Sequence, residues 1–248
     1  MTFKEWLCSS YPNPSKHGEW GLGHIISLII IAAFIVVSTL LLKKRSEKDK
    51  RLVLLILAGT IMFFELARRV INLCITPNLN LHLVLRILLP RPGCAISCWL
   101  VMIAVFLNKK TLYNLASIIG ILCGGIFFIY PGAGYNNEYI LFENLYSIIT
   151  HCAFFASSIC LVTYGFTSFK YKDCWKEMIG IAIIIIYAFL EIAFKIEADP
   201  FFFMQNNEVQ EIVGMDYSVF VPCYIAFIIF YINLYYGIRL LKDKRKQA

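Results

Sequence analysis

Seven long apolar stretches alternate with short polar segments along the chain. Each stretch has about 17–23 residues, and a helix of that length crosses a hydrocarbon core of ~30 Å with some tilt. The pattern predicts an all-α membrane protein, one domain over residues 1–248, with seven transmembrane helices. The predicted spans are residues 22–42, 52–74, 91–107, 112–130, 145–164, 178–194 and 219–241.

A shorter apolar run, residues 81–89, precedes the third span and contains His82 and Arg86. Because it is too short to cross the membrane, it predicts a re-entrant or interfacial half-helix that lies against protein. Pro90 and Pro92 separate this run from the third span, since proline favours the start of a helix and cannot continue a preceding one.

The fourth span contains a pair of small residues, Gly120 and Gly124, four positions apart. Glycines at this spacing leave one face of a helix without side chains, so that a second helix can approach closely. We therefore expect a tight helix contact on this face.

The loops between the spans alternate in the sign of their charge. Basic residues gather in segments 43–51, 109–110, 170–176 and 242–246. Acidic residues gather in the intervening loops, at Glu138, Glu143, Glu197, Asp199, Glu208, Glu211 and Asp216. Lys and Arg are retained on the cytoplasmic side, so the pattern predicts N-out/C-in orientation in the plasma membrane.

The composition supports a membrane protein over other classes. Of the 248 residues, 59% are hydrophobic, whereas soluble domains are about 45–50% apolar. The net charge of +7 does not indicate nucleic acid as a partner, because the basic residues mark topology and suit anionic lipid head groups. Most of the nine cysteines fall in apolar spans, so we expect no disulfide framework.

Charged residues inside the spans are candidates for function. Glu65 has Arg68 and Arg69 three and four positions later, which places the carboxylate and a guanidinium on one helix face. This arrangement suits an ion pair that makes the charges tolerable, or an arginine directed at a lipid phosphate or a developing anion. Glu191, near the end of the sixth span, suits either a site role or an interfacial one, and His24 lies at the outer end of the first span.

Cys94 and His151 are the candidates for chemistry. Cys94 lies in the first turn of the third span, where the helix amino terminus and the adjacent Arg91 favour a thiolate. By helical rise, His151 in the fifth span lies within ~5 Å of the same depth. Cysteine and histidine form the minimal nucleophile–base pair for acyl transfer. The alternative is that both side chains only pack between helices, Cys94 together with Cys98.

A metal site is not expected from these residues. Cys94, Cys98 and His151 supply three ligands at most, and His151 and Cys152 point about 100° apart on a helix. We therefore predict neither a metal nor a cofactor.

Short motifs resemble a known family. The segment Leu89-Pro-Arg-Pro-Gly-Cys-Ala-Ile-Ser-Cys-Trp-Leu100 is similar to the Leu-Pro-Leu-His-Leu-Cys-Ser-Ile segment of the YwaF-like bacterial integral membrane family. The eukaryotic members of this family are the transmembrane protein 164 acyltransferases. Gly23-His24, the run from Asn108 to Asn114 and Ile148-Ile-Thr-His151 resemble further family motifs in the same order, over roughly residues 20 to 240.

The resemblance implies a seven-helix cysteine–histidine acyltransferase that acts on phospholipid. Cys94 would carry the acyl thioester and His151 would be the base. Pro92 departs from the family motif, which has a histidine two residues before the cysteine, and this puts the activity in question. No cofactor is implied.

The combined hypothesis is a membrane acyltransferase or lipid hydrolase that acts on phospholipid acyl chains near the outer face. Its partners are membrane lipid and an acyl-lipid substrate, and the sequence leaves the oligomeric state open. The alternatives are a non-enzymatic transporter or uptake subunit and a receptor-like seven-helix protein. Residues expected to orient the base or bind substrate are His24, Glu65, Arg68, Arg69, Arg91 and Glu191.

Overall fold

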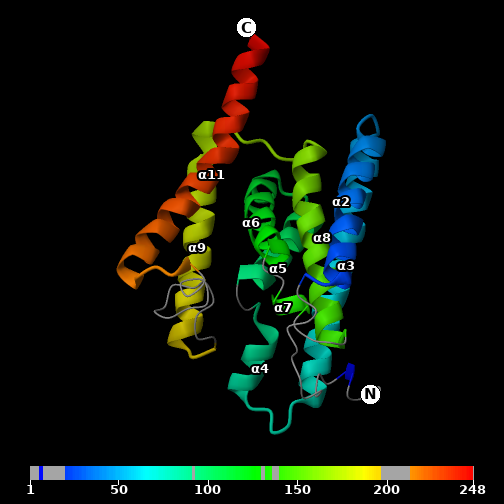
Figure 1. The fold of residues 1–248 in the computed structure, drawn as a ribbon, viewed down its shortest axis with the longest axis vertical. Coiled ribbons are helices and arrows are strands. Elements are labelled where there is room, and N and C mark those ends of the chain that lie inside the picture. Colours follow the sequence, from blue (N-terminus) through cyan, green and yellow to red (C-terminus); the bar gives the residue numbers. More distant parts are fainter. Residues whose placement is uncertain are drawn as a thin grey trace. The chain divides into compact units, whose positions relative to one another are not determined.

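The computed structural model describes residues 6–7, 20–90, 93–129, 132–135, 140–196 and 213–247, and every regular element in these ranges is helical. The prediction of an all-α protein is confirmed (Figure 1). The helices are α2 (Leu22–Leu42), α3 (Glu47–Ile75), α4 (Leu81–Leu88), α5 (Gly93–Leu107), α6 (Lys110–Ile129), α7 (Gly132–Tyr135), α8 (Phe142–Thr163), η2 (Tyr171–Asp173), α9 (Cys174–Ala193) and α11 (Tyr217–Gln247).

Four of these helices are long and apolar enough to cross a membrane: α2, α6, α8 and α11 as far as Leu241. A fifth span is formed if α4 and α5, which are bent by 62°, are taken together. The helices α3 and α9 have sufficient length, 29 and 20 residues, but contain buried charged residues such as Glu65 and Glu191. The chain is therefore a membrane protein with several candidate spans.

The chain divides into two compact units. The first contains residues 1–89 and 94–167, and the second contains residues 90–93 and 168–248. The single domain predicted from the sequence stays a prediction. Six of the eight candidate site residues lie in the first unit, and Arg91 and Glu191 belong to the second.

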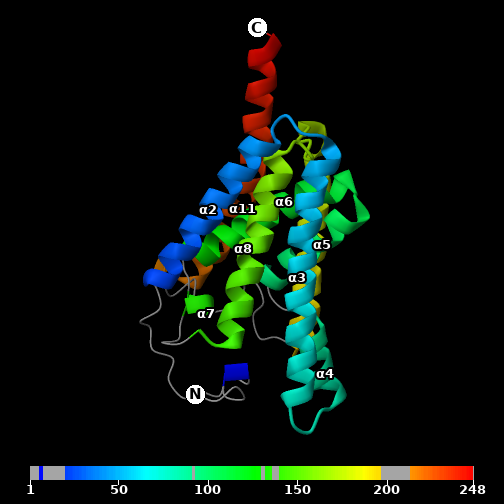
Figure 2. The same cartoon turned by 90° about the vertical axis from the view of Figure 1, so that its right-hand side faces the viewer.

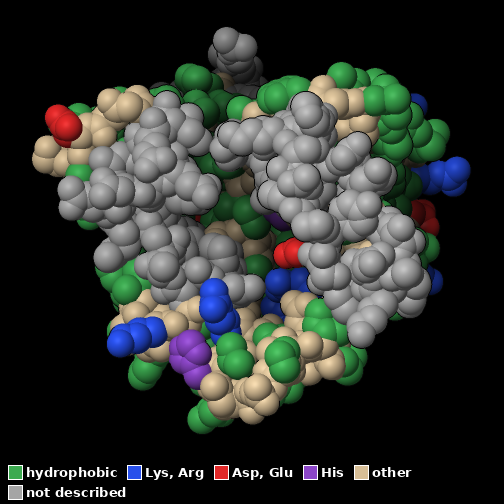
Figure 3. All heavy atoms as spheres, turned by 60° about the horizontal axis from the view of Figure 1, so that its bottom comes forward, with side chains coloured by type: hydrophobic (Ala, Val, Ile, Leu, Met, Phe, Trp, Pro, Cys, Tyr) green, Lys and Arg blue, Asp and Glu red, His purple; other side chains and the backbone are tan. Residues whose placement is uncertain are grey.

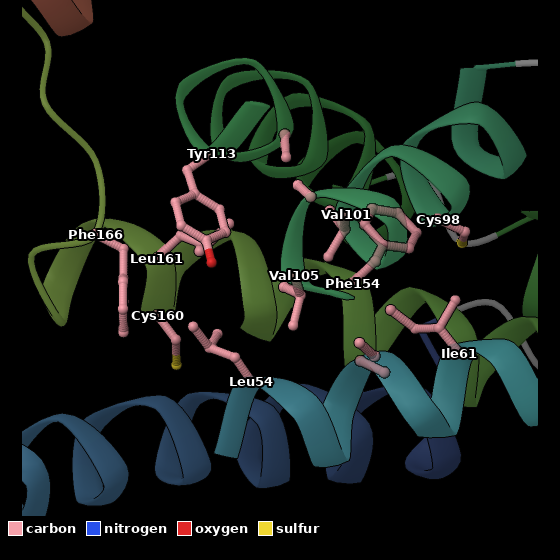
Figure 4. Packing of buried hydrophobic residues seen from close by; sticks show 14 of the residues in the cluster. Leu54, Ile61, Cys98, Val101, Val105, Tyr113, Phe154, Cys160, Leu161 and Phe166 are labelled. Atoms are coloured by element: carbon pink, nitrogen blue, oxygen red, sulfur yellow. The ribbon is translucent and has the colours of Figure 1, made fainter. Parts of the chain in front are cut away.

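In the first unit, α8 is the central helix and packs against α2, α3, α6 and α7 (Figures 1 and 2). Apolar side chains from α3, α5, α6 and α8 point toward one another in its main core (Figure 4). Leu54, Val101, Tyr113, Phe154 and Leu161 are fully buried there. This core fixes the relative positions of the helices that carry Glu65, Cys94 and His151.

Side-chain caps explain where two helices begin. The Ser46 hydroxyl accepts a hydrogen bond from the Asp49 backbone N–H at 3.2 Å and starts α3. The Asn80 side chain accepts one from the Leu83 N–H at 2.9 Å and starts α4. The half-helix predicted before the third span is thus present as a helix. Its re-entrant or interfacial role stays a prediction.

The close helix contact expected at the glycine pair is present between α6 and α8. A methyl group added at Gly120 would collide with Ser158, and one added at Gly124 would lie 2.5 Å from the Phe155 ring. A methyl group added at Gly125 would meet nothing within 4 Å. The missing side chains therefore let α6 lie directly against the central helix.

Gly120→Val should destabilise the protein by about 1–3 kcal/mol, the usual effect of inserting atoms into a filled interior. Thermal unfolding in detergent measures this change. Gly125→Val is the matched control, because it makes the same substitution on the open side of α6. Equal melting temperatures for the two variants would contradict the packing described here.

Candidate functional site

A buried ion pair joins three helices of the first unit. Glu65 and Arg69, both on α3, form a salt bridge and are 1% and 3% exposed. Arg69 Nε donates a hydrogen bond to the carbonyl oxygen of Leu88 on α4 at 3.1 Å. Trp99 on α5 donates its indole N–H to the Glu65 carboxylate at 3.2 Å. The sequence placed Glu65 with either arginine, and the structure pairs it with the one four residues later.

Arg68 is placed differently from its neighbour. Its guanidinium lies over the ring of Tyr146 on α8, 4.8 Å from the ring centroid. The Arg68 Nε is buried and has no hydrogen-bond partner among the described residues. Arg68 therefore contacts the helix that carries His151, whereas Arg69 is held by α3, α4 and α5.

The ring of His151 is fixed by one hydrogen bond and one aromatic contact. Its Nδ1 lies 2.7 Å from the carbonyl oxygen of Ser147, one turn earlier on α8. Because a carbonyl oxygen only accepts hydrogen bonds, Nδ1 carries the proton and Nε2 keeps a lone pair. The ring stacks on Phe127 of α6 with centroids 3.7 Å apart.

Cys94 is partly buried at the start of α5, and its thiol lies beside the thiol of Cys123 on α6. Cys123 and Phe127 are four residues apart, so they share one face of α6. Cys94 and His151 thus border the same face of α6, about one helical turn apart. Among the described residues, the His151 ring is hydrogen-bonded to Ser147, and no hydrogen bond joins it to Cys94.

His24 joins α2 to α6. It is fully buried, and its Nε2 lies 3.1 Å from the carbonyl oxygen of Phe128. Its ring lies between Trp20 and Tyr135, with centroids 4.8 and 4.9 Å away. These contacts place His24 at the end of α6 next to the Phe127–His151 stack.

Two of the predicted site residues are not in this group. Glu191 lies on α9 in the second unit, where it is buried and accepts a hydrogen bond from the Tyr187 hydroxyl at 2.9 Å. Arg91 lies outside the described residues, as does Pro92. Within the described ranges, no three His, Cys, Asp or Glu side chains are grouped so as to hold a metal ion.

The family comparison covers most of the chain. A family model described as the TMEM164 family matches residues 19–238. The chain belongs to the TMEM164 family. The search of curated proteins found no match, and neither did the search of solved structures. The matched region of this TMEM164 family member contains every candidate site residue named above, whereas the resemblance seen in the sequence rested on short motifs.

Several residues that touch the candidate side chains in this TMEM164 family member were not selected from the sequence. They include Trp99, Tyr146, Cys123 and Phe127. Trp99 carried one available signal, because a buried indole N–H usually has a hydrogen-bond partner. The others look like ordinary apolar residues of a span, and only the packing of α5, α6 and α8 reveals their contacts.

Proposed function

We propose that this protein is a membrane acyltransferase or lipid hydrolase in which Cys94 is the nucleophile and His151 is the base. The observation that carries the proposal is the His151–Ser147 hydrogen bond, which leaves Nε2 as the basic nitrogen. The shared face of α6 supports it, because Cys94 and His151 border that face one turn apart. Family membership and the resemblance to acyltransferase motifs support the same chemistry.

The reaction proceeds in two steps through an acyl thioester. His151 Nε2 takes the proton of the Cys94 thiol, and the sulfur attacks the ester carbonyl carbon of a phospholipid. The ester C–O bond breaks, and the lysolipid oxygen leaves with the proton from the imidazolium. A lipid hydroxyl or water then attacks the thioester, His151 takes its proton, and the thiolate leaves.

The thioester itself tests this proposal. Purified protein is incubated with a phospholipid whose acyl chain carries an alkyne, and the protein-bound label is located by mass spectrometry. We expect a label on Cys94 that hydroxylamine removes. The control is Cys160→Ala, which removes a fully buried thiol of the main core. In this variant Cys94 should be labelled as in the wild type. A label that persists in Cys94→Ala would refute the assignment of the nucleophile.

We also propose seven spans with N-out/C-in orientation in the plasma membrane. The count is reached if α3, α5 and α9 cross the membrane together with α2, α6, α8 and α11. The alternating loop charges support the orientation. With this orientation, Cys94 at the start of α5 is nearest the outer face.

Reporter fusions test the orientation. A reporter active only in the cytoplasm should give signal when fused after Lys246 and none when fused at Asn136, because these positions lie in a basic and an acidic segment. The reverse pattern would show that the thiol faces the cytoplasmic side.

A further inference from the structure

Arg68 and Arg69, which are adjacent on α3, differ in how many of their hydrogen-bonding groups already have partners. The charge of Arg69 is neutralised by Glu65, its Nε is used by the Leu88 carbonyl, and its face lies 5.1 Å from the Trp99 ring. Its Nη2 is buried without a hydrogen-bond partner among the described residues, but it belongs to a guanidinium that is already paired. Arg69 is therefore a structural residue of the bundle.

Arg68 has the same side chain, but among the described residues it forms no salt bridge and its Nε has no acceptor. The Tyr146 ring covers the face of the guanidinium, and stacking does not use the five N–H groups of its edge. The buried Nε donates to no acceptor in the described part of the chain. A buried donor without an acceptor is unfavourable, so an anion that accepts from this edge would stabilise the protein.

The position of Arg68 along α3 suits a phosphate. In the proposed topology, α3 crosses the membrane over the predicted span of residues 52–74. Arg68 then lies ~9 Å inside the boundary, a depth from which an arginine side chain can extend toward the interface. Arg86 on the neighbouring helix α4 is also exposed, and the view in Figure 3 shows Lys and Arg side chains together with an acidic one.

We infer that Arg68, held against Tyr146, binds the phosphate group of a phosphate ester through the edge of its guanidinium. A planar guanidinium forms two parallel hydrogen bonds to phosphate oxygens, which fixes the orientation of the ligand. The inference deepens the proposed function by naming the group that positions the substrate. Two sources share this chemistry, a lipid head group and free phosphate.

Binding measurements on the purified full-length protein in detergent test the inference. Native mass spectrometry compares dioleoylphosphatidylglycerol with dioleoylglycerol, which has the same acyl chains and no phosphate, and equilibrium dialysis measures radiolabelled inorganic phosphate. Wild type should prefer the phospholipid by at least about tenfold, the effect of one or two hydrogen bonds to a charged group. Arg68→Gln should lose this preference.

Two further variants keep the test decisive. Tyr146→Phe keeps the ring under Arg68 and should bind as wild type does. Arg68→Lys keeps the charge without the planar fork and should bind with intermediate affinity, which covers the case in which Arg68→Gln fails to fold. Unchanged phospholipid binding in the Arg68 variants would overturn the inference. So would equal binding of dioleoylglycerol and phospholipid by wild type together with no binding of inorganic phosphate that depends on Arg68.

The remaining outcomes distinguish a lipid head group from free phosphate as the ligand, and the phosphate site from the proposed acyl transfer. Inorganic phosphate bound with the same dependence on Arg68, in a protein that ignores the phospholipid, assigns the site to soluble phosphate. Cys94→Ala should bind phospholipid normally, because no described contact joins Cys94 to Arg68 or Tyr146. Binding that depends on Arg68 without any thioester would contradict only the proposed acyl transfer, and a thioester with binding independent of Arg68 would contradict only the phosphate site.

Discussion

Cys94→Ala should abolish acyl transfer, and His151→Ala should lower its rate by about 10²–10⁴-fold, the usual contribution of a general base. The two side chains act as a unit in the proposed mechanism, so the double variant should be no worse than Cys94→Ala alone. Rates on a labelled phospholipid, measured for the wild type and the three variants, give this comparison.

Melting temperatures are needed beside these rates. Alanine is close in size to cysteine, and the interhelical contact that His151→Ala removes is the stack on Phe127, a kind of contact worth about 0.5–1.5 kcal/mol. All three variants should therefore stay folded. Full activity in Cys94→Ala would rule out the mechanism, whereas a His151→Ala protein that loses only its fold would return the histidine to a packing role against Phe127.

Glu65→Gln should destabilise the protein strongly, by about 3–5 kcal/mol, the effect of breaking a buried pair. The substitution keeps the size of the side chain and an acceptor for the Trp99 N–H, but it leaves the buried Arg69 guanidinium without its counter-charge. We expect low expression and an early thermal transition, and not a selective loss of catalysis.

The double variant Glu65→Gln with Arg69→Gln distinguishes charge from packing. Removing both charges ends the desolvation penalty, so it should recover much of the stability lost in the single variant. Glu143→Gln is the control, because Glu143 is an exposed carboxylate at the start of α8. Normal melting of Glu65→Gln would show that the ion pair does not hold the three helices together.

Local features of the structure were predictable from the sequence. The apolar pattern gave the bounds of α2, Leu22–Leu42, because the charged residues that follow it end the apolar stretch. The spacing predicted an ion pair of Glu65 with Arg68 or Arg69, since residues three and four apart on a helix are neighbours, and the structure selects Arg69. Both depend only on positions close together in the chain.

Contacts between helices were not predictable in the same way. Nothing in the spacing of Arg68 and Tyr146, or of Cys94 and Cys123, shows that these residues meet, because helical periodicity does not specify which helices are neighbours. Equal depth suggested that Cys94 and His151 are close. The structure adds that both lie against one face of α6, where Cys94 contacts Cys123 and His151 contacts Phe127.

The ion pair of α3 has a consequence for the departure from the family motif at Pro92. Glu65 holds α5 through Trp99, and Arg69 holds α4 through the Leu88 carbonyl. Each of these helices is thus fastened to α3 separately, across the bundle, and not only through the chain that links them. These hydrogen bonds position α5, the helix that carries Cys94. The segment that links α4 to α5 can therefore change its sequence while the thiol stays in position.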